Sequence, residues 1–483
     1  MSISASKTLR WCIPGLDDEL GEIQPGTLIV LLGHPGAGKT TLVSKIVTCN
    51  IEKQCIKVVY FSTSETKEKY FTYMENLGLK LREFENKGSL KFIELPTFSG
   101  EMACDVFIDV LTRTVAEEDP DLIVIDSVTP ILWYLKDDPS RRSFLHAGIY
   151  KVVSELHKTM ILVGDLPYGK ERVDLGGIEF VADVVLVAKL LSERGKPTRR
   201  LEIRKFRGRN VKVSEFPFAI VEGPGIKIVK PPHTWSPKEH KVRSKLTLLE
   251  DDPLSRAIGP IFRGEQILVT YPIGSGVPLR FAVMTARRAI RNKLKLLVIT
   301  SSSSAELISS YIYSALVALG ECCSKEEFSK YVKVHVQDLF SMSVTELMGR
   351  TLAVSEEYDP DIVLVLDVTV ERDVLWQDME LFNQMNYVFV TIDRYNGIVT
   401  FRLLGIHGDD FRDAGLLAEM SDVVIQVAQQ SCCEYSMRVI KNPFRKPSPS
   451  AIQELEKELN SIVPQEEKFL QSLLEAGKIK LQR

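Results

Sequence analysis

Short apolar runs recur through the first half of the sequence, and most end at a polar or turn-forming residue. Such runs are typical of strands that are buried on both faces of a sheet. The longer segments between them place apolar residues at helical spacing, as at Val43, Ile46 and Val47. The predicted strands are 28–32, 57–63, 122–127, 160–165 and 182–187. Alternating strands and helices predict an α/β fold with a mostly parallel, twisted sheet flanked by helices.

The second half of the sequence repeats this order. A strand at 267–270 leads into Gly274 and Gly276, which follow Gly36 and Gly38 by 238 residues. The segment ending at Asp367 follows the one ending at Asp126 by 241 residues. Ser421-Asp422 follows Ala182-Asp183 by 239 residues. Three landmarks at nearly one offset indicate a tandem duplication of the whole domain.

Composition shifts divide the chain further. A polar, proline-bearing stretch begins at Pro231-Pro232, and another proline cluster follows Lys446. Beyond it, Ile452, Leu455 and Leu459 recur at helical spacing. The predicted parts are a first domain at 1–230, a linker at 231–255, a second domain at 256–446 and a helical tail at 447–483.

Overall composition excludes few function classes. Of 483 residues, 45% are hydrophobic and 26% charged, and the net charge of −3 gives no general signal for a polyanion partner. No apolar run approaches the ~18 residues of a membrane-spanning helix, and the N-terminus lacks a signal-peptide core, so we expect a cytoplasmic protein.

Eight cysteines are present, none in C-x-x-C spacing, which argues against a zinc site. In a reducing compartment we expect them to be reduced thiols at partly buried positions. Two adjacent pairs, Cys322-Cys323 and Cys432-Cys433, are able to oxidise, and the sequence leaves their redox state open.

The stretch from Gly33 to Thr40 has the form G-x-x-x-x-G-K-S/T between a predicted strand and helix, which makes it a P-loop. Its glycines let backbone N–H groups surround phosphate, Lys39 reaches the β- and γ-phosphates, and the Thr40 hydroxyl binds Mg²⁺. The sequence therefore predicts binding of ATP and Mg²⁺. The predicted nucleotide-binding residues are Gly33, His34, Pro35, Gly36, Ala37, Gly38, Lys39, Thr40 and Thr41.

Two carboxylates are predicted at the phosphate edge of the sheet. The run Leu122–Ile125 ends at Asp126, a Walker B pattern that places Asp126 where it can hold the metal with Thr40. The predicted strand at 57–63 leads directly into Glu65, the single carboxylate of that loop.

The second copy has lost this chemistry. Val277 stands in the place of Lys39, and Pro278 stands in the place of Thr40. Neither side chain can neutralise phosphate or bind a metal, and proline also removes a backbone donor. The loop matching Glu65 reads Ser301–Ser304, without a carboxylate. We expect the second domain to be a degenerate scaffold or regulator.

A basic stretch runs from Glu193 to Lys212 and contains nine lysines or arginines against two glutamates. One interpretation is the solvated edge of a hairpin, since charged side chains protect exposed strands from aggregation. The other is a functional patch, either for phosphate or for nucleic acid.

Several segments resemble the KaiC branch of the RecA/RadA superfamily, in which two RecA-like domains lie in tandem. Ile13–Asp17 resembles the family's I-P-G-F-D opening, and Leu122–Ser127 its V-V-I-D-S strand. Leu201–Gly208, followed by Glu215–Phe218, resembles its L-E-I-x-K-x-R-G…E-Y-P-F segment, which P-loop proteins in general lack. The resemblance covers most of the chain and is strongest over 10–230.

The resemblance implies a ring of subunits, usually a hexamer, with ATP between neighbours. Lys205 and Arg207 match the family's K-x-R-G and would reach the neighbour's γ-phosphate. Glu65 would activate water, and the loss of the family's second glutamate suggests slow turnover. The KaiC phosphorylation site, a Ser-Thr pair in the second domain, corresponds here to Ala418-Glu419, so we do not expect autokinase activity. Lys441 matches Lys205, whereas Pro443 takes the place of Arg207.

The sequence therefore predicts an ATPase with an active first domain, whose catalytic residues are Glu65, Lys39, Lys205 and Arg207 and whose metal ligands are Thr40 and Asp126. We expect a nucleotide-dependent, ring-forming regulatory or assembly protein with an unknown protein partner and no membrane partner. The alternatives are a RadA-like recombination accessory protein that binds DNA, which is less favoured, and a scaffold that holds ATP without hydrolysing it.

Overall fold

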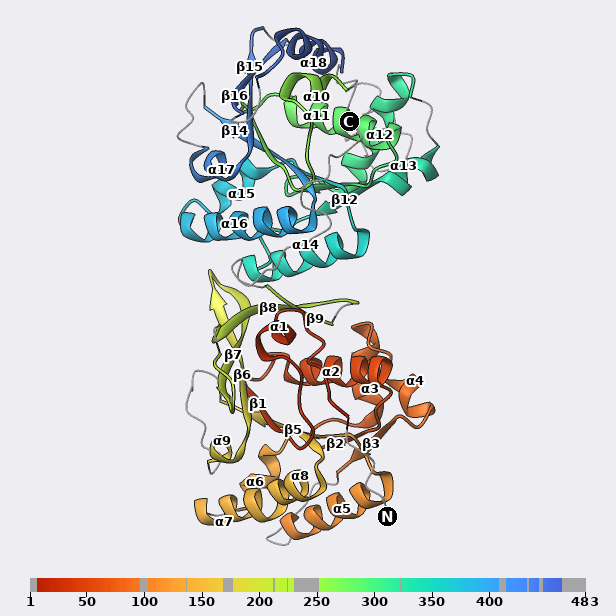
Figure 1. Ribbon diagram of the computed structural model, residues 1–483, viewed down its shortest axis with the longest axis vertical. Helices are drawn as coiled ribbons and strands as arrows, with labels where there is room; N and C mark the ends of the chain where they lie inside the picture. The colour runs from red at the N-terminus through yellow and green to blue at the C-terminus, as the bar shows by residue number, and fades with distance from the viewer. Residues whose placement is uncertain are drawn as a thin grey trace, which may run out of the picture. The chain divides into compact units, whose positions relative to one another are not determined.

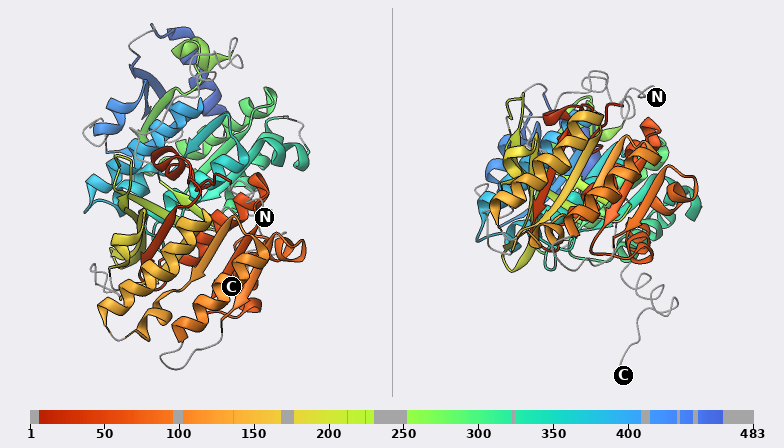
Figure 2. Two further views of the ribbon diagram at one scale, coloured as in Figure 1. Left: turned by 60° about the horizontal axis from the view of Figure 1, so that its bottom comes forward. Right: turned by 90° about the horizontal axis from the view of Figure 1, so that it is seen from below.

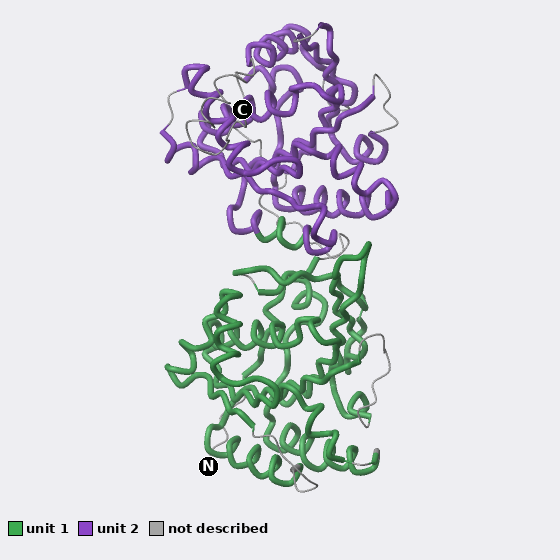
Figure 3. The backbone as a smooth tube through the Cα atoms, turned by 180° about the vertical axis from the view of Figure 1, so that it is seen from behind, with its two compact units in different colours: residues 1–230, 348–353 green, residues 231–347, 354–483 purple. Residues whose placement is uncertain are grey.

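The chain forms two compact units, residues 1–230 with 348–353 and residues 231–347 with 354–483 (Figure 3). The computed structural model describes residues 7–95, 103–135, 137–167, 177–211, 213–223, 225–229, 252–321, 324–407, 414–431, 434–442 and 446–462. Most of the predicted linker, both adjacent cysteine pairs, Lys212, Pro443 and the tail beyond Ile462 lie outside these residues.

The first unit is built on a sheet of order β3-β2-β4-β5-β1-β6-β7-β8-β9 (Figure 1). Its strands are β1 (Leu28–Gly33), β2 (Val58–Ser62), β3 (Leu90–Glu94), β4 (Leu122–Asp126), β5 (Thr159–Asp165), β6 (Val184–Glu193), β7 (Lys196–Phe206), β8 (Glu215–Val221) and β9 (Gly225–Ile228). The pairs from β3 to β6 are parallel, and β7, β8 and β9 follow antiparallel. The mostly parallel sheet predicted from the apolar runs is therefore confirmed.

Helices cover both faces of this sheet (Figure 1, Figure 2). They are α1 (Leu16–Leu20), α2 (Lys39–Gln54), α3 (Lys67–Asn76), α4 (Leu81–Asn86), α5 (Ala103–Glu118), α6 (Thr129–Trp133), α7 (Asp138–Ser143), the π-helix η1 (Phe144–Tyr150), α8 (Lys151–Leu156) and α9 (Ile178–Val181). Among the helices that the structure describes in either unit, none is both long and apolar enough to cross a membrane.

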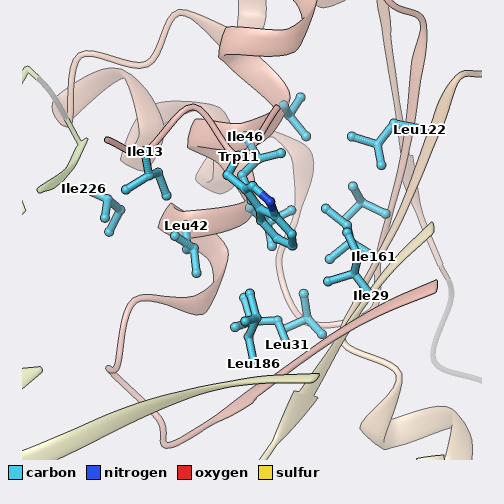
Figure 4. Packing of buried hydrophobic residues seen from close by; sticks show 14 of the residues in the cluster. Trp11, Ile13, Ile29, Leu31, Leu42, Ile46, Leu122, Ile161, Leu186 and Ile226 are labelled. Atoms are coloured by element: carbon cyan, nitrogen blue, oxygen red, sulfur yellow. The ribbon is translucent and has the colours of Figure 1, made fainter. Parts of the chain in front are cut away.

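Strand β1 lies inside the sheet and is buried on both sides, which explains its unbroken apolar sequence. Ile29 and Leu31 face the cluster formed with α1 to α4, whereas Leu28, Val30 and Leu32 face the cluster formed with α5, α6, η1, α8 and α9. Trp11 is fully buried in the first cluster, among side chains of α2 and of the sheet (Figure 4). Both layers hold the start of the P-loop in a fixed place.

The second unit has strands β10 (Gln266–Pro272), β11 (Leu296–Thr300), β12 (Val332–Val336), β13 (Ile362–Val365), β14 (Val399–Ile406), β15 (Val423–Gln429) and β16 (Tyr435–Lys441). Its helices are α10 (Pro253–Ile258), α11 (Val277–Arg291), α12 (Ala305–Ala318), α13 (Lys325–Tyr331), α14 (Val344–Tyr358), α15 (Val368–Val374), α16 (Met379–Asn396), α17 (Gly415–Met420) and α18 (Pro449–Ser461). The sheet order is β12-β11-β13-β14-β10-β15-β16, with only β16 antiparallel.

The two sheets share one topology, because β10 to β16 follow the order of β1 to β7 strand for strand. This agrees with the tandem duplication predicted from the sequence offsets. Helix α10 begins at Pro253, inside the predicted linker, where Asp252 caps its N-terminus. Helix α18 packs against α10, α11 and β16 through Ala451, Leu455 and Leu459, so the first part of the predicted tail belongs to the core of this unit.

Two residues of α2 bind the N-terminal segment of the first unit to this helix. Cys49 forms a disulfide with Cys12, which corrects the expectation that these cysteines are reduced thiols. The neighbouring Asn50 side chain exchanges two hydrogen bonds with the backbone of Arg10, at 2.9 and 2.7 Å. Cys12 and Cys49 are 37 residues apart in sequence, so only the packing of this segment across α2 brings them together. Cys55 and Cys104 are free thiols.

Candidate functional site

The P-loop connects β1 to α2, and its glycines are required by close packing. Gly36 and Gly38 have positive φ angles of 74° and 90°, a region in which only glycine is unstrained. A Cβ atom on Gly33 would lie 2.2 Å from the carbonyl oxygen of Ala188, and one on Gly38 would lie 2.8 Å from Ile220. The loop therefore keeps its backbone open at the N-terminus of α2, where N–H groups and the helix dipole favour an anion.

Lys39 is buried at the base of this loop. Its ammonium group donates to the carbonyl oxygens of Gly33 at 3.0 Å and His34 at 3.2 Å. It also pairs with the Asp165 carboxylate at 3.0 Å. The sequence predicts a phosphate contact for this side chain, and the pairing with Asp165 is an additional feature that the structure reveals.

Asp126 lies at the carboxyl end of β4, as predicted, and is 9% exposed. One of its oxygens accepts hydrogen bonds from Thr40 at 2.8 Å and from the Tyr60 hydroxyl at 2.7 Å. Burial raises the pKa of Asp126, and the two hydroxyl donors oppose that rise by stabilising the carboxylate. The predicted metal ligands Thr40 and Asp126 are thus in direct contact.

Glu65 lies in the loop after β2, at the same edge of the sheet. The Ser62 hydroxyl bonds to the backbone of Glu65 and holds this loop in place. One Glu65 carboxylate oxygen is buried and has no hydrogen-bond partner among the residues that the structure describes. Burial, followed by the nearby charge of Asp126, raises the pKa of Glu65, and Lys69 partly opposes this. A buried, unpartnered carboxylate oxygen of raised pKa suits a base that accepts a proton.

These side chains surround a cavity of about 410 Å³, within the range of small-molecule sites. Lys39, Thr40, Glu65, Asp126 and Asp165 form its polar half. The side chains of Tyr73, Met74, Leu77 and Ile220 contribute an apolar wall. The first set of side chains has the chemistry to contact phosphate groups, and the second has the chemistry to contact an aromatic base.

The predicted nucleotide-binding residues divide into two groups. Gly36, Gly38, Lys39, Thr40 and Thr41 border the cavity, whereas Gly33, His34, Pro35 and Ala37 do not. The ring of His34 is buried instead, and its Nδ1 accepts a hydrogen bond from the backbone N–H of Leu190 at 3.1 Å. His34 therefore anchors the P-loop to β6.

Lys205 and Arg207 lie near the C-terminal end of β7 and do not border this cavity. Lys205 donates to the carbonyl oxygens of Glu179 and Phe180, and Arg207 donates to Phe180 and pairs with Asp183 at 3.2 Å. Both cations therefore have polar partners within the first unit, so their proximity does not require an external anion between them. Their predicted role at a neighbour's nucleotide stays a prediction.

Lys441 in the second unit makes the same kind of contact as Lys205. Its ammonium group donates to three carbonyl oxygens at the end of α17, those of Ala418, Glu419 and Ser421. Asp422, the counterpart of Asp183, pairs with Arg394 of α16 at 2.8 Å. Lys205 and Lys441 thus make the same kind of structural contact in the two units. In the second unit Arg394, and not a residue of the neighbouring strand, pairs with the aspartate.

Several arginines of the basic stretch pair with carboxylates of the same sheet and of α9. Strand β7 lies between β6 and β8, so it is not the solvated edge that the sequence suggested. Arg200 pairs with Glu215, and Arg204 pairs with Glu202 and Glu179. On β6, Lys189 pairs with the same Glu202 and Glu215. Alternating charges on neighbouring strands therefore account for much of the basic composition.

The second unit fills the corresponding position with its own side chains. Tyr271 replaces the first glycine of the loop and is buried, with its hydroxyl 3.4 Å from that of Thr369. Asp367, the counterpart of Asp126, accepts hydrogen bonds from the Thr300 hydroxyl and from the backbone N–H groups of Ser301 and Ser302. Val277 is fully buried in the apolar core.

Sequence reasoning missed Tyr60 and the pairing of Asp165 with Lys39. In the sequence, Tyr60 is one of several large side chains in the predicted strand 57–63. The signal that could have found it is the hydroxyl itself, because a buried tyrosine needs a hydrogen-bond partner. Asp165 ends an apolar run in the same way as Asp126, and that position marks the phosphate edge of a parallel sheet.

Comparison with known proteins agrees with this geometry. Residues 9–233 match the family model described as the KaiC ATPase. The circadian clock protein KaiC3 of Synechocystis sp. is 27% identical over 277 residues, covering 55% of this chain and 54% of that protein. The circadian clock oscillator protein KaiC 1 of the same organism is 24% identical over 182 residues, covering 38% of this chain and 34% of its own length.

A third relative, the circadian clock oscillator protein KaiC of Picosynechococcus sp., is 23% identical over 185 residues, which cover 38% of this chain and 35% of that protein. The chain thus matches about half the length of the first relative and about a third of the other two. The matched part includes the P-loop, Asp126 and the strand order of the first unit. Residues 9–233 are therefore similar to the KaiC ATPases of the RecA superfamily, and the strand order of the first unit agrees with that similarity.

Proposed function

We propose that the first unit binds ATP with Mg²⁺ and hydrolyses it slowly. The observation that carries this proposal is the convergence of Lys39, Thr40 and Asp126 in one cavity beside an open P-loop. A hydroxyl and a carboxylate oxygen are the hard ligands that Mg²⁺ prefers. Thr40 and Asp126 would hold the ion, which would neutralise charge on the phosphate oxygens.

The remaining residues would bring about hydrolysis. Lys39 is placed to exchange its carbonyl partners for phosphate oxygens, since its ammonium group already lies inside the loop. Glu65 is the candidate base that accepts a proton from the attacking water, because no side chain or backbone group of the described segments competes for its buried oxygen. A single carboxylate in this loop, in place of the family's two, is the reason for proposing slow turnover.

We further propose that subunits assemble into a ring, a hexamer by resemblance to the family, in which Lys205 and Arg207 approach the neighbour's nucleotide. The Arg207 side chain is 48% exposed, so solvent and a partner can reach it. Such a ring would act as a nucleotide-dependent regulatory or assembly device with a protein partner of unknown identity. The buried Tyr271 and Val277 support a non-catalytic second unit without autokinase activity.

The recombination alternative is not proposed. It would need a basic surface for nucleic acid, and the ion pairs of Arg200, Arg204 and Lys189 with carboxylates of the same sheet reduce that surface. No observation on the described residues favours it.

Calorimetry with ATP and Mg²⁺ tests the proposal through its stoichiometry. We expect one nucleotide per chain. Lys39→Ala should weaken ATP binding by about 100-fold or more, because charge-assisted contacts to phosphate are among the strongest polar interactions. Val277→Ala, the matched change in the second unit, should leave affinity unchanged. Two equivalent sites per chain, or unchanged affinity in Lys39→Ala, would contradict the proposed site.

A further inference from the structure

Asp165 occupies a position where parallel pairing brings it against the P-loop. It ends β5, and its register partner on β1 is Gly33, the first residue of the loop. From there its carboxylate reaches the Lys39 ammonium group at 3.0 Å. Of the described residues that line the cavity, Lys39 is the one cation, and it is already paired with a carboxylate.

Asp165 is held in this orientation by two hydroxyl groups. Its second carboxylate oxygen accepts a hydrogen bond from Ser127 at 2.9 Å. Its backbone N–H donates to the Thr129 hydroxyl at 2.7 Å. The side chain is nevertheless 45% exposed, because it borders the cavity. The carboxylate is thus fixed beside the phosphate position and open to it.

The second unit offers an internal comparison. In its sheet the register partner of Tyr271, the counterpart of Gly33, is Gly405. Gly405 thus stands where Asp165 stands, and Val277 stands where Lys39 stands. The unit that lost the lysine also lacks the carboxylate, as expected if the two side chains act on each other.

The charge of the cavity follows from its lining. Lys39 is opposed by Glu65, Asp126 and Asp165, so acidic groups outnumber the cation. ATP without a metal would bring further negative charge into this space, and Lys39 would have to share its contacts between Asp165 and the phosphates. Like charges a few ångströms apart in a partly buried site repel strongly. A divalent cation delivered with the nucleotide would offset this repulsion.

We propose that Asp165 is a specificity residue that makes the site select nucleotide carrying a divalent cation over metal-free nucleotide. The inference rests on the proposed function, namely that this cavity binds ATP. It assigns Asp165 neither to the metal nor to the attacking water. Asp165 would lower the affinity for metal-free nucleotide, because its carboxylate competes with the phosphates for Lys39 and repels them directly.

The test measures ATP affinity by calorimetry twice for each protein, once with Mg²⁺ and once with a chelator. The quantity compared between proteins is the ratio of the dissociation constant with chelator to the dissociation constant with Mg²⁺. Asp165→Asn keeps the size of the side chain and removes its charge. It should tighten binding of metal-free ATP and lower the ratio by about tenfold or more. Asp109→Asn is the matched control, since it breaks only an exposed pair with Arg113 on α5. It should leave the ratio unchanged.

Three outcomes would overturn the inference. A ratio equal to that of the unmodified protein would show that Asp165 does not discriminate. Weaker binding of ATP with Mg²⁺ alone would make Asp165 a metal ligand. Absence of ATP binding in the unmodified protein under both conditions would refute the proposed function itself. If Asp165→Asn folds poorly by its melting curve, Asp165→Ser provides the same comparison and should change the ratio in the same direction.

Discussion

Tyr60→Phe is the sharpest perturbation that the proposed metal site offers. It removes one oxygen atom, the hydroxyl that donates to Asp126 at 2.7 Å. The ring remains, and so do its contacts with Tyr70 and Phe92, whose ring centres lie 4.9 and 5.3 Å away. Because Tyr60 is fully buried, the substitution removes the donor without changing the protein surface. Besides its interaction with the Tyr70 hydroxyl, what is lost is the hydrogen bond to Asp126.

The magnitude follows from the charge on Asp126. A hydrogen bond to a charged group is worth about 1.5–3 kcal/mol, which corresponds to roughly 10- to 100-fold in an equilibrium constant. After the substitution only Thr40 donates to that oxygen among the contacts described. The carboxylate form becomes less stable, so the pKa of Asp126 rises further above its ordinary value, in the direction that burial already drives it.

The assay is the affinity for Mg²⁺ of the ATP-loaded protein, measured across pH. Metal binding needs the carboxylate, so affinity falls as pH falls through the pKa of Asp126. In Tyr60→Phe we expect weaker Mg²⁺ binding at neutral pH and loss of the remainder at a higher pH than in the unmodified protein. Tyr271→Phe is the control, because it removes a buried tyrosine hydroxyl of the second unit, 3.4 Å from that of Thr369, and Tyr271 does not border the cavity. Equal Mg²⁺ affinity and an equal pH midpoint in Tyr60→Phe and the unmodified protein would refute the reasoning.

Two further predictions concern hydrolysis. Glu65→Gln should keep ATP bound but slow turnover by about 100-fold or more, the scale of losing a general base, as single-turnover assays with labelled ATP would show. Undiminished turnover would assign that role elsewhere, with Asp165 the next candidate. Arg207→Ala should leave ATP affinity largely intact and reduce turnover by about 1,000-fold if the residue acts as an arginine finger. Mixing Arg207→Ala with Lys39→Ala should then restore activity, because some interfaces would combine an intact P-loop with an intact arginine. A monomer by light scattering that still hydrolyses ATP would exclude a shared site.

Local sequence was sufficient for the central features. The P-loop is a run of consecutive residues between a strand and a helix, so its glycines, lysine and threonine specify it without distant partners. The apolar strand ending at Asp126 is similarly self-contained, and the repeated spacing in both halves predicted a shared topology that the two sheets display. The physical reason is that strand and helix periodicity, turn chemistry and phosphate cradling act over a few residues.

The tertiary structure decided which distant side chains meet. Tyr60 contacts Asp126 because β2 and β4 are parallel neighbours in a register that pairs Ser62 with Asp126. Asp165 reaches Lys39 because β5 pairs with β1 at Gly33. A shift of register would separate these partners without changing any local pattern in the sequence.

Tertiary structure also decided how the charged residues and thiols are paired, which composition alone could not predict. Arginines of the basic stretch find carboxylates on adjoining strands and helices, and Cys12 meets Cys49 through the packing of the N-terminal segment on α2. Composition counts charges and thiols, but whether each one is paired depends on distances of a few ångströms between elements far apart in the chain. Those distances are set by the order and register of the strands and by the close packing of helices on the sheet.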